Sequence, residues 1–85
     1  MNKVNWKPKA VKQLMKLPKP DQILIRDEVG EQLTLFPESR NIKKLSNHAY
    51  SCRLRVGRYR VFFEFDGSVK VVSIEEVKKR DEHTY

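Results

Sequence analysis

The stretch that decides the fold lies in the second half of the chain and reads YSCRLRVGRYRVFFEF, residues 50–65. Every second residue from Tyr50 to Val56 is apolar, and polar or basic residues stand between them. This alternation is typical of a strand with one buried face. Gly57 marks a tight turn, and alternation resumes from Arg58 to Phe65. The stretch therefore predicts two adjacent antiparallel strands.

The flanking residues extend this pair into a meander. Asp66 and Gly67 form one of the strongest hairpin signals in a sequence. A third strand is expected over about Val69–Val77, followed by a short tail to Tyr85. On the other side, Ser39–His48 is a polar connection without a predicted element. Tyr50 is expected to share the apolar side of its strand with Cys52, since both are at even positions.

Toward the N-terminus the sequence predicts a short edge strand and two helices. Lys3–Trp6 alternates, Pro8 suits the first turn of a helix, and Pro18 ends that helix. A second helix opens at Pro20 and ends at Pro37. The apolar stripes are Ala10, Val11, Leu14 and Leu17 in the first helix and Ile25, Val29, Leu33 and Phe36 in the second.

These elements predict an α+β fold: an N-terminal strand, a helical hairpin and an antiparallel three-stranded meander, with the helices packed on one face of the sheet. A chain of 85 residues allows one domain, residues 1–85. Hydrophobic residues make up 39% and charged residues 34%, as in soluble folded proteins. With the single Cys52, no signal peptide and no long apolar run, a cytoplasmic location without membrane contact is expected.

The net charge of +7 is unevenly distributed. Residues 39–63 hold seven basic residues and no acid, residues 1–20 hold six lysines and no acid, and residues 21–38 are acidic. Segregated positive charge indicates a protein that meets a polyanion. A surface that is basic without any such partner is the alternative.

Strand geometry gathers part of this charge on one surface. On adjacent antiparallel strands, Arg53 and Arg55 are expected on the same helix-free face as Arg58 and Arg60. Phe62 lies among them and offers a stacking surface for a nucleobase. The alternative is that these arginines form a solvated outer face of the sheet.

The residues 50–65 resemble the central hairpin of the RelE/ParE toxin superfamily, with its LRxGxYRvxY-like core. The order of the predicted elements is similar as well. The ending VKKRDEHTY, residues 77–85, resembles the hxxVxxRxxxY tail of the RNA-cleaving branch. The resemblance covers nearly the whole chain and supports the RelE-like fold.

The resemblance implies a ribosome-dependent endoribonuclease, the toxin of a type II toxin–antitoxin system, which cuts mRNA in the decoding site without a metal ion or cofactor. The 2'-hydroxyl of the RNA then attacks the adjacent phosphate. Arg60 and Arg80 are expected to grip the scissile phosphate, which suits the guanidinium fork. Arg53 and Arg55 would hold flanking phosphates, and Tyr85 would stack on the displaced base or assist proton transfer.

The proton acceptor is less evident. Some family members carry two lysines where this chain has Ser51 and Arg53, and arginine is a poor base. His83, His48 and Glu64 are the candidates, with His83 first because related toxins often place a histidine near the terminal tyrosine. Histidine also titrates nearest neutral pH.

A second basic surface is expected on the first helix, where Lys9, Lys12 and Lys16 align along one side. In the resembling toxins such lysines contact ribosomal RNA; a merely soluble helix face is the alternative. The expected partners are a cognate antitoxin protein, the ribosome and mRNA. Two other functions stay open: a ParE-like toxin that binds DNA gyrase, and an RNA-binding module that does not cleave.

Overall fold

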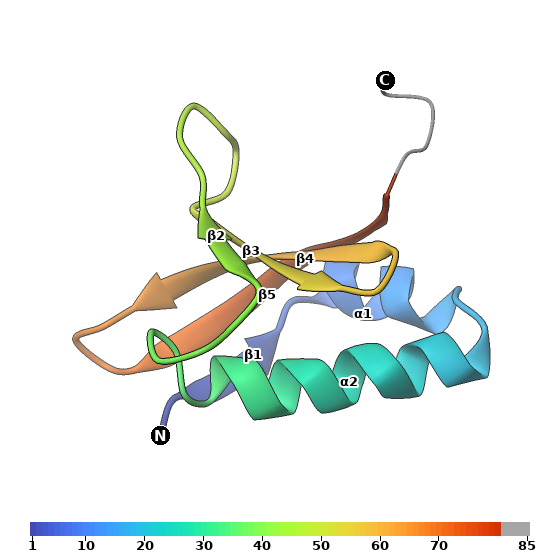
Figure 1. Ribbon diagram of the computed structural model, residues 1–85, viewed down its shortest axis with the longest axis horizontal. Coiled ribbons are helices and arrows are strands. Elements are labelled where there is room, and N and C mark those ends of the chain that lie inside the picture. Colours follow the sequence, from blue (N-terminus) through green and yellow to red (C-terminus); the bar gives the residue numbers. More distant parts are fainter. Residues whose placement is uncertain (81–85) are drawn as a thin grey trace.

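The computed structural model describes residues 1–80 and contains two helices and a five-stranded sheet (Figure 1). In chain order the elements are β1 Lys3–Trp6, α1 Pro8–Met15, α2 Lys19–Leu33, β2 Ile42–Lys44, β3 Cys52–Val56, β4 Tyr59–Asp66 and β5 Val71–Lys79. The strand order is β1-β5-β4-β3-β2. Only β1 and β5 pair in parallel. Both helices lie on one side of the sheet, which confirms the α+β architecture expected from the sequence.

The core lies between the helices and the sheet. It consists of Ala10, Leu14, Ile25, Val29, Leu33, Phe36, Cys52, Leu54, Val56, Tyr59, Val61, Phe63, Val72, Ile74 and Val77. The predicted apolar stripes supply most of the helical part. Val11 is an exception, because 40% of it is exposed. Phe36 follows the end of α2 and still packs edge-on against Phe63, with ring centroids 5.4 Å apart.

Hydrogen bonds fix the ends of the second helix. The Asn2 amide donates to the carbonyls of Leu33 at 3.0 Å and Phe36 at 2.7 Å, and thus satisfies groups that a helix end leaves unpaired. At the other end, the Tyr59 hydroxyl donates to Asp21 at 2.5 Å. The second helix is therefore tied at one end to the N-terminus and at the other to β4.

The predicted meander is present, with three differences. Residues 42–44 add an edge strand that the polar composition of this segment did not indicate. The turn between β4 and β5 takes four residues instead of two, and Lys70 adopts a positive φ of 55° to close it. In contrast, the tight turn predicted at Gly57 is found, with a φ of 54° that favours glycine.

The third difference is a β-bulge in the last strand. Phe62 pairs with Glu76 and Phe63 with Ile74, which leaves Glu75 unpaired. A bulge shifts the alternation of one strand by one residue. As a result, Val77 reaches the core while Glu76 lies on the opposite face of the sheet, although strict alternation from Ile74 would have given the reverse.

Candidate nucleic-acid interface

The side of the sheet away from the helices carries a basic surface whose geometry follows from the strand register. Residues directly opposite each other on neighbouring strands point to the same side. Arg55 pairs with Arg60, and Arg60 with Lys78, so three cations form one row. Arg53 lies in the next row, between Lys43 and Phe62. The expectation of a shared face is thus confirmed for Arg53, Arg55 and Arg60, whereas Arg58 lies in the turn and not in β4, which begins at Tyr59.

Two further arginines lie at one end of these rows. Arg58 occupies the turn after Gly57, and its carbonyl accepts a hydrogen bond from the backbone N–H of Arg80 at 2.6 Å. Both residues are exposed. We refer to this surface as the basic face, and it comprises Lys43, Arg53, Arg55, Arg58, Arg60, Lys78 and Arg80. The basic face thus brings the arginines of the β3–β4 hairpin together with Arg80, the arginine that precedes the C-terminal tail.

The charges of the basic face are mostly not neutralised by carboxylates. Within residues 1–80, Arg55, Arg58 and Arg60 form no ion pair. Like charges directly across a strand pair repel each other, so the pairing of Arg55 with Arg60 is unfavourable on its own. A bound polyanion would relieve this repulsion, and the arrangement is therefore suited to phosphate groups.

Phe62 does not offer the open stacking surface that the sequence suggested. It is 5% exposed, and the His48 ring stacks on it at 5.0 Å with an interplanar angle of 14°. Tyr50 covers it as well, at 5.6 Å. The physical reason is that residues 45–51 fold back over the sheet and cover this aromatic side chain. Consequently Tyr50, which was expected on the core side, lies on the basic face.

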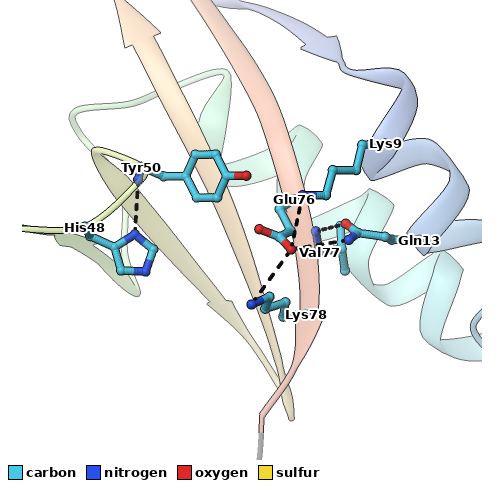
Figure 2. A network of polar contacts seen from close by, with 7 residues as sticks. All are labelled: Lys9, Gln13, His48, Tyr50, Glu76, Val77 and Lys78. Atoms are coloured by element: carbon cyan, nitrogen blue, oxygen red, sulfur yellow. Dashed lines mark hydrogen bonds and ion pairs between the residues drawn. The ribbon is translucent and has the colours of Figure 1, made fainter.

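A buried carboxylate lies next to these rings. Glu76 is 9% exposed, and its Oε1 lies 3.4 Å from Gln13 Nε2, 3.6 Å from Lys9 Nζ and 3.9 Å from Lys78 Nζ (Figure 2). Burial acts to raise the pKa of Glu76. The Tyr50 hydroxyl and the Gln13 amide, together with the nearby ammonium groups, outweigh burial and leave this pKa lowered. Glu76 is therefore an ionised group that organises its neighbours.

The other candidate groups have differing surroundings. Glu64, a candidate proton acceptor, accepts hydrogen bonds from the backbone N–H of Ser51 at 2.9 Å and from its hydroxyl. The first-helix lysines are all exposed, and Lys9 also reaches Glu76. His83 and Tyr85 lie outside the described residues. Among residues 1–80, no group of three or more potential metal ligands is found.

Sequence reasoning missed Glu76, Tyr50 and Gln13. One signal was available for Glu76: the core residues of the last strand are spaced 72, 74 and then 77, and a gap of three in an alternating pattern indicates a bulge. The positions of Tyr50 and Gln13 depend on contacts between distant segments. No local pattern indicates them.

Comparison with solved structures places the fold among the RelE toxins. The isolated E. coli RelE toxin superimposes with a TM-score of 0.79 at 16% identity, with 99% of this chain and 89% of the other covered. The RelBE2 toxin–antitoxin complex of Mycobacterium tuberculosis gives 0.76 at 25% identity, covering 93% and 98%. The archaeal RelE–RelB complex of Pyrococcus horikoshii gives 0.70 at 26%, covering 95% and 97%. The fold is therefore that of the RelE toxins.

A match to a family model identifies the family of this chain. The model described as the ParE toxin of the type II toxin–antitoxin system matches residues 4–84. The chain therefore belongs to the RelE/ParE superfamily of type II toxins. A search of curated proteins found no match. No helix within residues 1–80 has the length and apolar character needed to cross a membrane.

Proposed function

We propose that this toxin is a ribosome-dependent endoribonuclease that cleaves mRNA in the decoding site and thereby inhibits translation. The observation that carries the proposal is the basic face, which sets Arg60 between Arg55 and Lys78 and brings Arg80 beside Arg58. Such a cluster suits the dianionic phosphate that forms when a 2'-hydroxyl attacks the adjacent phosphodiester.

Each group has a defined task in the proposed reaction. Arg60 and Arg80 stabilise the scissile phosphate, and Arg53 and Arg55 hold its neighbours. The attacking 2'-hydroxyl loses a proton and the leaving 5'-oxygen gains one, so the reaction needs a proton acceptor and a proton donor. His48, His83 and Tyr85 are the candidates for proton transfer, while Lys12 and Lys16 contact ribosomal RNA.

The proposed partner of the free toxin is an antitoxin with an acidic, amphipathic segment. Such a segment would neutralise the basic face and exclude RNA from it. Support comes from the similar structures, several of which were solved as complexes of RelE with RelB.

One observation favours a second candidate function. The matching family model is the one described as ParE, and a ParE-like toxin would act by binding DNA gyrase. The endoribonuclease proposal is preferred because cationic side chains on adjacent strands of one sheet face suit phosphate chemistry.

The test is primer extension on an mRNA translated by purified ribosomes, with wild-type toxin and the Arg60→Ala variant. We expect specific cuts with the wild type and a rate at least about a hundredfold lower with the variant, because a donor to the transition-state charge is lost. Arg26→Ala is the matched control, since Arg26 is an exposed arginine on α2. Inhibition of gyrase supercoiling with no RNA cut would establish the second candidate instead.

A further inference from the structure

The tip of the loop that joins β2 to β3 is held over the basic face by two of its side chains. Its base is closed by a backbone hydrogen bond from Leu45 N–H to the Ser51 carbonyl at 2.8 Å. Its tip contacts the sheet through His48 and Tyr50, whose rings both pack on Phe62. The tip residues are otherwise exposed. The position of the loop tip therefore depends on how Tyr50 and His48 are held, whereas Ser51 at the loop base is bound to Glu64.

The Tyr50 hydroxyl faces the buried carboxylate of Glu76. Figure 2 shows the Tyr50 ring with its hydroxyl directed toward the Glu76 carboxylate, and this hydroxyl is one of the groups that lower the pKa of Glu76. Glu76 is held from the opposite side by Gln13, whose Oε1 in turn accepts the Val77 N–H at 2.7 Å. The pairing of β5 with β1 ends at Ile74, so the Val77 N–H has no partner strand on that side. The Gln13 side chain supplies the missing hydrogen-bond acceptor. The anchor is built from three elements: α1, β5 and the loop.

His48 is fixed in orientation by the same loop. Its Nδ1 accepts a hydrogen bond from the Tyr50 backbone N–H at 3.1 Å, so in the neutral ring the proton is on Nε2. The second ring nitrogen is turned away from Tyr50 (Figure 2). Because Phe62 lies directly opposite Arg53, the imidazole stacked on it is next to the basic face. Among residues 1–80, His48 is the only histidine.

We propose that Glu76 and Tyr50 are positioning residues, which hold the 45–51 loop so that the His48 imidazole is presented to RNA at the basic face. This inference rests on the proposed function. Glu76 itself does not touch the substrate: it is 9% exposed, and its carboxylate is engaged by Tyr50, Gln13, Lys9 and Lys78. His48 donates from Nε2 to a phosphate oxygen or to the leaving oxygen.

The test uses two isosteric variants of the full chain, Tyr50→Phe, which removes only the hydroxyl, and Glu76→Gln, which removes only the charge. Ribosome-dependent cleavage and the imidazole ¹⁵N resonances of His48 are measured for each. We expect cleavage to fall by about ten- to a hundredfold, because a displaced catalytic group loses alignment. We also expect both His48 ¹⁵N resonances to shift. In a His48→Ala background, either substitution should have little further effect on cleavage.

Glu75→Gln is the matched control, because Glu75 is the adjacent carboxylate and has no hydrogen bond or ion pair within residues 1–80. It should leave cleavage and the His48 resonances unchanged. Loss of cleavage with Glu76→Gln but not with Tyr50→Phe would mean that the carboxylate acts directly, and would overturn the proposal. So would thermal destabilisation with unchanged cleavage and unchanged resonances.

Failure of the proposed function gives a different result. If wild-type toxin cuts no RNA on the ribosome, the endoribonuclease proposal fails. The ¹⁵N measurement still decides whether Glu76 and Tyr50 fix the imidazole, since it requires no substrate. Unshifted resonances in both variants would refute the positioning role in that case as well.

Discussion

The two faces of the sheet are built from the same strands and differ in almost every property. On the helix side, alternate residues of β3 and β4 such as Leu54, Val61 and Phe63 are 0% exposed and apolar. On the other side, the intervening residues are mainly arginines, and the only deeply buried groups are Phe62 and Glu76 among the described residues. Burial of the apolar face stabilises the fold. The other face carries like charges that repel each other and do not contribute to stability.

The adjacent phenylalanines test this division most strongly. Phe63→Ala should lower the free energy of unfolding by about 3–5 kcal/mol, because it leaves a cavity in a closed core. Phe62→Ala should cost about 1–2 kcal/mol, because the exposed loop above it can collapse onto the sheet. Urea denaturation of both variants gives the comparison. Equal losses would mean that the loop packs as rigidly as the helices.

The second largest effect on stability is expected from the hydrogen bond between Tyr59 and Asp21. Tyr59→Phe removes a hydroxyl donor to a carboxylate, and we expect a loss of about 1–3 kcal/mol at neutral pH. The hydrogen bond to Asp21, followed by burial, raises the pKa of Tyr59. The stabilisation is therefore complete below the unfolded pKa of about 10 and is lost as pH rises through the folded pKa.

Melting temperatures between pH 8 and 11 measure this effect. The wild type should lose its advantage over Tyr59→Phe at the alkaline end, so the two curves converge. A constant difference across the range would show that the hydroxyl is not the group that titrates.

The smallest effect concerns the cross-strand arginines. Arg55→Gln removes the repulsion with Arg60 and should raise the free energy of unfolding by about 0.2–1 kcal/mol. The same substitution should weaken RNA binding and reduce the slope of log K against log salt by about 0.7, for one lost phosphate contact. Calorimetry and binding titrations at several salt concentrations measure the two effects, with Arg26→Gln as control. A loss of stability would show that Arg55 contributes to the fold.

The sequence predicts much of the difference between the two faces of the sheet, because the alternation of apolar and polar residues is a local property. The pattern from Cys52 to Phe65 by itself predicts that Arg53, Arg55 and Arg60 share one side of the sheet, and the strand register confirms it. The helical stripes likewise identify Leu14, Ile25, Val29 and Leu33 as core residues.

The part of the site that the sequence does not predict depends on contacts between distant segments. The anchor at Glu76 needs a bulge in β5, a glutamine from α1 and a loop that precedes β3, and no window of sequence contains all three. Alternation predicts the wrong face for Tyr50, because Tyr50 lies two residues before the strand, which begins at Cys52. The proposed roles of His83 and Tyr85 stay predictions, since both lie outside the described residues.

The edges of the sheet bear on how the free toxin behaves in solution. The outer strands, β1 and β2, have four and three residues, and they carry Lys3, Lys43 and Lys44. Short, lysine-bearing borders discourage another chain from adding a strand. Because both borders are short and charged, we expect no pairing of strands between molecules to interfere with assays of the basic face.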